Sequence, residues 1–296
     1  MSKPKVLLVA DVPGWIFERH CQELKKRLSD DFEFSIGYRR GKINQNEPDL
    51  IYAMEYSSLE NPRFPEKTLC GIRAEFRYHS KPNQGFWNAI KNRYAGIHVV
   101  NERMVGHFAS FGVNLLNLPH GVDTELFTGE PREQTGELVC GWTGSNRPDK
   151  GRNILEKLNI PGVKVLCHRG QGKTNKSKEQ MVEYYRQMDV YVCASATEGH
   201  NNPLMEAGAM ARVLISTKTG SAPEYIEDGI NGFLVERDSE AFKKAIEYLR
   251  DNRDKVAEMG LAAQKVVRER WSWKVRAEAY RKFFWDHLQK ESPSEN

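Results

Sequence analysis

The sequence predicts an α/β protein of two domains, each built on a parallel sheet. Short apolar runs recur along the chain and alternate with stretches of helical periodicity, a pattern typical of buried parallel strands covered by helices. One polar stretch interrupts this series, and the series then starts again. A length of 296 residues is enough for about two domains.

The first domain is predicted from six apolar runs and one clear amphipathic helix. Residues 16–28 place Phe17, Cys21 and Leu24 at helical spacing, with charged residues between them. Together with the runs on either side, this helix makes one β-α-β unit, so we expect a Rossmann-like domain. The expected strands cover residues 5–10, 33–38, 50–54, 68–72, 97–100 and 115–118.

A polar stretch from Thr128 to Gly136 separates the two series, and we interpret it as a linker. We therefore expect a first domain over residues 1–127, a linker over 128–136 and a second Rossmann-like domain over 137–273. An aromatic-rich helix over residues 274–290 is expected to pack back toward the N-terminal domain. The expected strands of the second domain cover residues 137–142, 163–167, 190–193, 213–216 and 232–235.

Composition excludes several classes of protein. The apolar runs are far shorter than the ~20 residues that span a bilayer, and the first residues resemble no signal peptide, so we expect a cytoplasmic protein. Five scattered cysteines give neither a disulfide framework nor a zinc spacing, which indicates reduced core thiols. The formal charge of +4 is spread along the chain and does not favour nucleic-acid binding.

A pair of carboxylates follows one strand of the second domain. Glu198 comes shortly after the run that ends at Cys193, and seven residues separate it from Glu206. We expect Asn202 to be the N-cap of a helix and Pro203 its first residue, which places Glu206 one turn inside. A helix N-terminus at a sheet edge can bind a diphosphate, while carboxylates accept hydrogen bonds from sugar and ribose hydroxyls. One segment is therefore suited to bind a whole nucleotide-sugar.

This motif, Glu-x7-Glu followed by Ala207, resembles the retaining glycosyltransferases of family 4. Further segments fall in the order expected of that family. They are the turn Pro119–Phe127, the phosphate loop Gly144–Gly151, the segments 219–224 and 228–235, and Trp271–Trp273 at the start of the C-terminal helix.

The resemblance implies the glycosyltransferase B architecture, in which two domains face each other across a cleft and the C-terminal domain binds the donor. By this likeness Glu206 holds the ribose, Glu198 contacts the transferred sugar and Lys150 binds the diphosphate, whose charge grows as the sugar–phosphate bond breaks. We expect a UDP- or GDP-linked sugar as substrate, retention of configuration and no metal or other cofactor. The expected acceptor is a glycan, a lipid-linked carbohydrate or a small molecule.

The candidate catalytic residues are Glu198, Lys150 and His79. Relatives carry an Arg directly after the first glycine of the phosphate loop, where this chain has Ser145, so Arg147 is a candidate replacement. Asn201 and Asn202 are equally well interpreted as turn and cap residues. The candidate donor-binding residues are Gly14, Gly144, Arg147, Lys150, Glu198, Gly199, His200, Asn201, Asn202, Leu204, Glu206 and Gly220.

The N-terminal half is less informative. Gly14 follows the first strand, where relatives have a glycine-rich loop. For the histidine that contacts the sugar in relatives we choose His79, with Arg73 and Glu75 as alternatives. The amphipathic stretch Phe86–Tyr94 is suited to a peripheral contact at the inner face of a membrane, although most such helices pack on their own sheet.

Two alternative functions remain open from the sequence. A nucleotide-sugar epimerase of the same fold would release nucleotide without needing an acceptor. A non-catalytic subunit would bind a nucleotide-sugar and transfer nothing, and the missing arginine is the feature that favours it.

Overall fold

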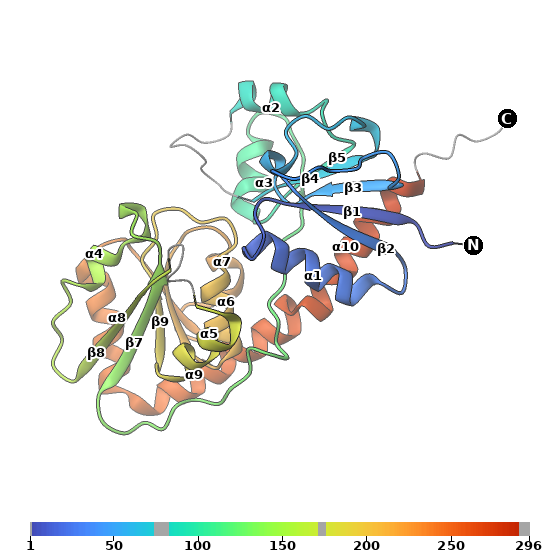
Figure 1. Ribbon diagram of the computed structural model, residues 1–296. Coiled ribbons are helices and arrows are strands. Elements are labelled where there is room, and N and C mark those ends of the chain that lie inside the picture. The colour runs from blue at the N-terminus through green and yellow to red at the C-terminus, as the bar shows by residue number, and fades with distance from the viewer. Residues whose placement is uncertain (1, 74–82, 171–175, 290–296) are drawn as a thin grey trace. The chain divides into compact units, whose positions relative to one another are not determined.

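The computed structural model describes residues 2–73, 83–170 and 176–289, and the chain divides into two compact units. Unit 1 comprises residues 1–121 and 273–296, and unit 2 comprises residues 122–272. Each unit is a parallel sheet with helices on both of its faces (Figure 1). The predicted α/β fold class is therefore confirmed.

Unit 1 has a six-stranded sheet in the order β2-β1-β3-β4-β5-β6. All five strand pairs are parallel. Alternate residues of β1 face opposite layers: Val6 and Leu8 pack with α1, and Leu7 and Val9 with the other face. The strands are β1 (Lys5–Ala10), β2 (Glu33–Tyr38), β3 (Leu50–Ala53), β4 (Thr68–Ile72), β5 (Gly96–Val99) and β6 (Leu116–Asn117).

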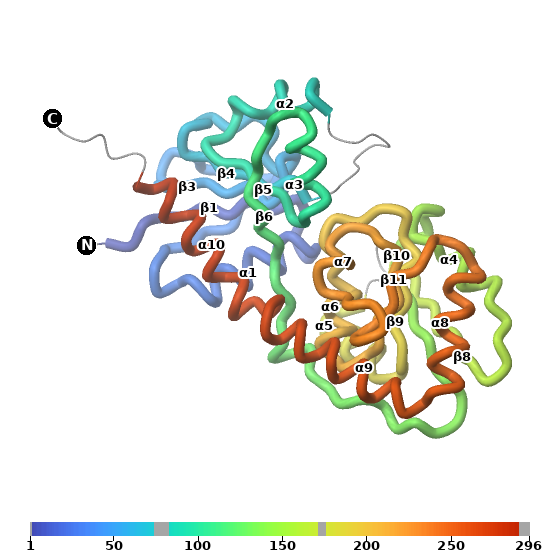
Figure 2. Tube along the Cα trace, turned by 180° about the vertical axis from the view of Figure 1, so that it is seen from behind, coloured from blue at the N-terminus to red at the C-terminus, as the bar shows by residue number. Residues whose placement is uncertain are grey.

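The last helix of the chain belongs to unit 1, as the sequence predicted. Figures 1 and 2 show this helix, α10, lying beside α1, and the aromatic side chains of α10 enter the same core as α1. The Tyr280 hydroxyl donates to the Leu118 carbonyl at 3.1 Å. The helical elements of unit 1 are α1 (Ile16–Leu28), η1 (Tyr56–Ser58), η2 (Pro65–Lys67), α2 (Gln84–Ile90), α3 (Glu102–Ala109) and α10 (Trp273–Leu288).

A buried guanidinium joins α10 to the sheet. Arg73 follows β4 and is only 7% exposed. Its guanidinium donates to the hydroxyls of Tyr52 at 2.7 Å and Tyr280 at 3.0 Å, and it also contacts the Met54 carbonyl and His120. A buried charge is tolerated when its donors are satisfied, so Arg73 has a structural role here.

The aromatic residues of α2 take part in packing within unit 1. Phe86 contacts the ring of Tyr56, and Trp87 contacts the ring of Phe108. These two large rings therefore already have partners within unit 1. Membrane contact through this segment stays a prediction. Among the described residues, no helix is both long and apolar enough to cross a bilayer.

Unit 2 has a five-stranded sheet in the order β11-β10-β9-β7-β8, and its strand pairs are again parallel. Cys167, expected in the core, is exposed on the edge strand β8, whereas the other four cysteines are buried and all five are free thiols. The strands are β7 (Leu138–Gly144), β8 (Val163–Arg169), β9 (Val190–Cys193), β10 (Val213–Thr217) and β11 (Gly232–Val235).

The segment expected to be a linker packs against unit 2. Arg132 binds both carboxylate oxygens of the buried Asp189, at 3.0 and 2.8 Å, and the Arg212 guanidinium donates to the Glu130 carbonyl. The division between the units falls at Gly121, several residues before the expected linker. The helical elements of unit 2 are η3 (Pro148–Lys150), α4 (Arg152–Leu155), α5 (Lys178–Arg186), α6 (Asn202–Ala209), α7 (Ala222–Tyr225), α8 (Ser239–Asp251), α9 (Arg253–Val266) and η5 (Val267–Trp271).

The buried His98 of β5 makes the stability of unit 1 depend on pH. Burial, together with the Arg73 charge, lowers the pKa of His98 from 6.5 to about 3. The unfolded chain therefore binds a proton on His98 below pH 6.5, and the folded chain does not until about pH 3. Stability should fall as pH drops through this window, by up to about 1.4 kcal/mol per pH unit from this group.

His98→Gln should reduce that loss, and urea unfolding between pH 7.5 and 5 measures it. Gln keeps a polar partner for the Tyr52 hydroxyl, which lies 2.7 Å from His98 Nε2. His107→Gln on α3 is the matched control. Equal acid sensitivity of His98→Gln and the unmodified protein would contradict the assignment.

Candidate functional site

A pocket lies in unit 2 at the carboxyl ends of β7 and β9. β8 pairs with one edge of β7 and β9 pairs with the other edge. The order in which the chain adds strands to the sheet therefore reverses at β7. Ligands bind in parallel sheets at such a switch point, because the loops after the two strands diverge there. The residues that line the pocket are Trp142, Thr143, Gly144, Lys150, Tyr191, Cys193, Ser195, Glu198, His200, Asn201, Asn202 and Pro203.

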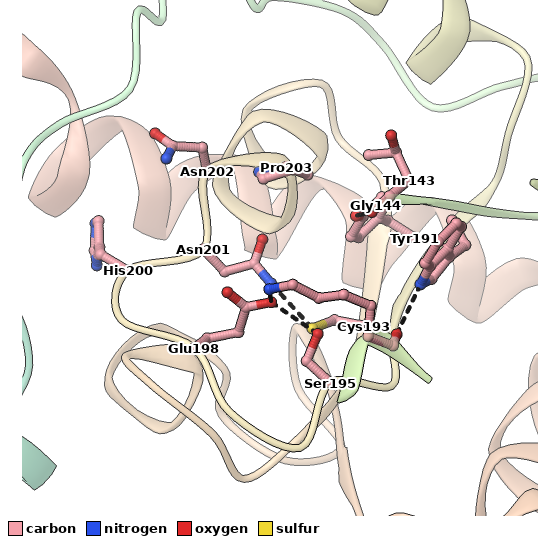
Figure 3. A pocket seen from close by; sticks show the side chains of 12 residues that line it. Thr143, Gly144, Tyr191, Cys193, Ser195, Glu198, His200, Asn201, Asn202 and Pro203 are labelled. Atoms are coloured by element: carbon pink, nitrogen blue, oxygen red, sulfur yellow. Dashed lines mark hydrogen bonds and ion pairs between the residues drawn. The ribbon is translucent and has the colours of Figure 1, made fainter. Parts of the chain in front are cut away.

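The pocket has a volume of about 150 Å³. Sites that enclose a whole small-molecule ligand usually measure roughly 300–1,000 Å³. This pocket can therefore hold only one part of a molecule as large as a nucleotide-sugar. Figure 3 shows Glu198, Ser195, Asn201 and Cys193 close together, with the side chain of His200 lying apart from this group.

Two opposite charges meet in the pocket. Lys150 Nζ lies 2.6 Å from Glu198 Oε1, and the Ser195 hydroxyl donates to the same oxygen at 2.7 Å. The two charged side chains are 21% and 16% exposed. The pair is thus partly shielded from water, and each charge is neutralised by the other in this structure.

The backbone around Lys150 is fixed by close packing. Gly151 has a φ of +71°, and a Cβ atom there would lie 2.0 Å from the Ala194 carbonyl oxygen, so only glycine fits. The Trp142 indole N–H donates to the Lys150 carbonyl at 3.2 Å. Arg237 donates to the carbonyls of Ala194 and Pro148, both at 3.0 Å, and so ties the loop after β7 to the end of β9.

The loop that carries Glu198 is held in a similar way. Gly220 has a φ of +53°, and a Cβ atom there would lie 2.5 Å from the Gly199 carbonyl oxygen and 2.9 Å from Glu198 Cβ. The backbone N–H of Ser221 donates to that same Gly199 carbonyl at 3.1 Å. Gly199 and Gly220 therefore shape the backbone beneath Glu198.

Helix α6 begins one residue earlier than the sequence indicated. Asn201, not Asn202, is the N-cap, because its side-chain oxygen accepts from the Leu204 backbone N–H at 3.2 Å. Its amide also donates to the Cys193 sulfur at 3.0 Å. Pro203 was expected to be the first helical residue, which made Asn202 the N-cap. Because proline is tolerated at either of the first two helical positions, Pro203 does not determine which asparagine is the N-cap.

Glu206 lies on α6 and outside the lining of this pocket. Its Oε2 accepts a hydrogen bond from the Tyr185 hydroxyl at 2.7 Å. Burial first, and the nearby carboxylate second, raises the pKa of Tyr185 well above its usual value, so this hydroxyl keeps its proton. The second carboxylate of the motif is therefore oriented by a buried tyrosine of α5.

Cys193 lines the pocket but is not suited to act as a nucleophile. Burial raises the pKa of its thiol, and the charge of Glu198 adds to that effect. The thiolate form, which is the reactive one, is therefore disfavoured. Cys193 is a packing residue whose sulfur accepts a hydrogen bond from Asn201.

Arg147 does not line the pocket. Its guanidinium forms a two-bonded ion pair with Asp149, and its side chain is 63% exposed. This pair lowers the pKa of Asp149 and raises that of Arg147. Nothing in this arrangement places Arg147 where relatives have their phosphate-binding arginine.

The remaining candidates fall in different places. The Leu204 side chain is fully buried in the core of unit 2. Gly14 lies in unit 1, where its backbone N–H donates to Glu18. His79 and its alternative Glu75 lie outside the described residues.

The candidate site residues chosen from the sequence did not include several lining residues, namely Trp142, Thr143, Tyr191, Cys193, Ser195 and Pro203. Ser195 could have been found, because it comes two residues after the end of β9, at the edge where ligands bind. Trp142 and Tyr191 gave no such signal, since both read as ordinary apolar strand positions. Among the described residues, no group of three or more His, Cys, Asp and Glu side chains is suited to a metal ion.

The two units match the fold of solved glycosyltransferase structures. Sucrose-phosphate synthase (tll1590) from Thermosynechococcus elongatus matches 98% of this chain and 100% of its own, with a TM-score of 0.79 and 14% identity. The structure of Anabaena Alr3699/HepE in complex with UDP and glucose matches 96% of this chain and 100% of its own, with a TM-score of 0.75 and 15% identity. At these identities the likeness shows the fold, and the fold is that of the glycosyltransferase B class.

Unit 2 also matches a sequence family. Residues 134–252 match the model of the glycosyl transferases group 1. The D-inositol 3-phosphate glycosyltransferase of Corynebacterium jeikeium (strain K411) is 27% identical over 165 residues, which are 54% of this chain and 38% of that protein. The protein of the same name from Streptomyces griseus subsp. griseus is 29% identical over 129 residues, which are 43% of this chain and 26% of that protein. The chain thus spans less than two-fifths of the length of these relatives.

Gly220→Ala should disturb the Glu198 loop as well as stability. The new methyl group must move away from the Gly199 carbonyl, which adds a steric cost to the left-handed backbone. We expect a loss of roughly 2–4 kcal/mol in the free energy of unfolding, measured with urea.

Gly229→Ala is the matched control. Gly229 has a φ of +77°, but a Cβ atom there would have no heavy atom within 4 Å, so only the backbone cost of about 1 kcal/mol is expected. Equal losses in the two variants would show that the contact with Gly199 is not tight.

Proposed function

We propose that this protein is a retaining glycosyltransferase that transfers a hexose from a UDP- or GDP-linked donor to a glycan, glycolipid or small-molecule acceptor, without a metal. The observation that carries the proposal is the meeting of Lys150 and Glu198 in the switch-point pocket. These are the residues that the family 4 resemblance assigns to the diphosphate and the sugar. Both belong to the segment that matches the glycosyl transferases group 1 model.

Several similar proteins support a nucleotide-sugar as the donor. Anabaena Alr3699/HepE has been solved with UDP-glucose, and the two curated relatives are glycosyltransferases by name. The pocket volume of about 150 Å³ fits one part of such a donor rather than the whole molecule. In this proposal the ribose binds to Glu206, which lies outside the pocket and accepts a hydrogen bond from Tyr185.

Lys150 carries most of the charge stabilisation in this proposal. Pro203 has no N–H, and the Leu204 N–H already donates to Asn201, so two of the first N–H positions of α6 cannot bind phosphate. Arg147 is paired with Asp149. A single ammonium group in a partly dehydrated pocket therefore meets the negative charge that grows on the leaving diphosphate.

The proposed reaction needs no covalent step on the protein. The acceptor hydroxyl attacks the anomeric carbon on the face that the diphosphate leaves, so configuration is retained. A diphosphate oxygen takes the hydroxyl proton. Glu198 orients the sugar through its hydroxyls, and Lys150 stabilises the leaving group.

A thermal-shift screen tests the proposal. The protein is heated with EDTA present, alone and with UDP, GDP, ADP and their common sugar derivatives, because a ligand that binds the folded state raises the melting temperature. We expect a shift of several degrees with one nucleotide family. Stabilisation by none of them would reject the proposed donor site.

Turnover separates the remaining alternatives. Nucleotide release that depends on an added acceptor supports transfer. Release or isomerisation without any acceptor supports the epimerase. Donor binding with neither reaction supports a non-catalytic subunit.

Glu206→Ala should weaken donor binding at least about tenfold, because the ribose hydroxyls lose a charged hydrogen-bond acceptor. Isothermal titration with the nucleotide selected by the screen measures the affinity. Glu183→Ala, which removes an exposed carboxylate on α5, is the control and should bind normally. Unchanged affinity in Glu206→Ala would contradict the ribose assignment.

A further inference from the structure

The two residues assigned to the donor form an ion pair with each other in this structure. Lys150 Nζ and Glu198 Oε1 are 2.6 Å apart, yet the proposed function requires Lys150 to bind the diphosphate and Glu198 to bind the sugar. While this ion pair is intact, one donor of the Lys150 ammonium and one oxygen of the Glu198 carboxylate are bonded to each other. Donor binding therefore competes with the pair.

Ser195 provides the carboxylate with a second, fixed partner. Its hydroxyl donates to the same Glu198 oxygen at 2.7 Å, and Ser195 itself is only 3% exposed. The Ser195 carbonyl accepts from the Thr217 hydroxyl at 2.6 Å, which ties this residue to the end of β10. Ser195 can hold Glu198 in place after Lys150 has left.

Of Lys150, Glu198 and Ser195, the lysine has the most mobile side chain. Its backbone is held by Gly151 and by the Trp142 indole, but its four-carbon stem has several rotatable bonds. The ammonium can therefore turn from the carboxylate to a phosphate while the loop stays still. Glu198, in contrast, lies on a backbone packed against Gly220.

We infer that donor binding exchanges the partners of Glu198: the diphosphate takes Lys150, and Ser195 retains the carboxylate and positions it for the sugar hydroxyls. Ser195 is thus a positioning residue of the site. The inference rests on the proposed function. Its consequence is that a nucleoside diphosphate alone breaks the ion pair without giving Glu198 a new partner, whereas an intact nucleotide-sugar supplies one.

Titration calorimetry with UDP and UDP-glucose, or GDP and GDP-mannose if the screen selects guanosine, tests the exchange. Glu198→Gln should bind the nucleoside diphosphate about fivefold more tightly than the unmodified protein, because no ion pair has to be broken. Its preference for the nucleotide-sugar over the nucleoside diphosphate should fall. The gain should shrink in 0.5 M salt, since salt already weakens the pair.

Glu198→Asp distinguishes exchange from simple repulsion. Asp keeps the negative charge but is one methylene shorter, so its contact with Lys150 is weakened. Exchange predicts tighter binding of the nucleoside diphosphate in this variant also. Repulsion of the phosphates by the carboxylate predicts no gain, and that result would overturn the inference.

Ser195→Ala tests the positioning role. Its affinity for the nucleoside diphosphate should stay within about twofold of the unmodified protein, while its preference for the nucleotide-sugar falls about fivefold. If the role of Ser195 were merely structural, Ser195→Ala would lower the affinity for both ligands by the same factor. An unchanged preference would remove Ser195 from the site.

Glu258→Gln is the matched control for charge removal. Glu258 also forms an ion pair with a lysine, Lys255, at 2.6 Å, but on the exposed surface of α9. Both ligands should bind this variant normally. Failure of the unmodified protein to bind any nucleotide would reject the proposed function itself, whereas normal binding without a gain in Glu198→Gln and Glu198→Asp would reject only the exchange.

Discussion

The site depends on the direct packing of the loop after β7 against the end of β9. Gly151 lies so close to the Ala194 carbonyl that no side chain fits, and the Ala196 N–H donates to the Asp149 carbonyl at 2.7 Å. These backbone contacts bring two loops, widely separated in the sequence, to a fixed spacing. Lys150 on one loop and Glu198 on the other therefore meet, although neither strand alone determines their distance.

Much of the fold follows from local sequence patterns. The strands of both units begin and end within about two residues of the predicted ranges, and α1 matches its predicted range, because apolar periodicity reports directly on burial. The unit boundary was harder to predict. The polar stretch before β7 reads as a linker, yet Arg132 anchors it to the buried Asp189, a partner far away in the sequence.

In the candidate site, too, residues could be predicted from local motifs, whereas their contacts with other residues could not. Lys150 and Glu198 could be named from their motifs, since the residues around them recur in a known order. The N-cap at Asn201 could not be chosen over Asn202 from sequence, because both side chains can accept from the helix. The pairing of Arg147 with Asp149 depends on the shape of the loop, so the sequence offered Arg147 as a phosphate ligand where the structure gives it another partner.

If Lys150 binds a phosphate as proposed, the ion pair in the pocket also affects which anions can reach it. An exposed lysine binds any phosphate, because its ammonium is a point charge with little geometric preference. Here a phosphate must first displace a carboxylate that is partly buried and further held by Ser195. Free phosphate gains one contact and breaks another, so it has little net advantage. In the proposed exchange, a ligand that carries a sugar next to its diphosphate gains contacts at both Lys150 and Glu198, so the pair would favour the complete donor over its fragments.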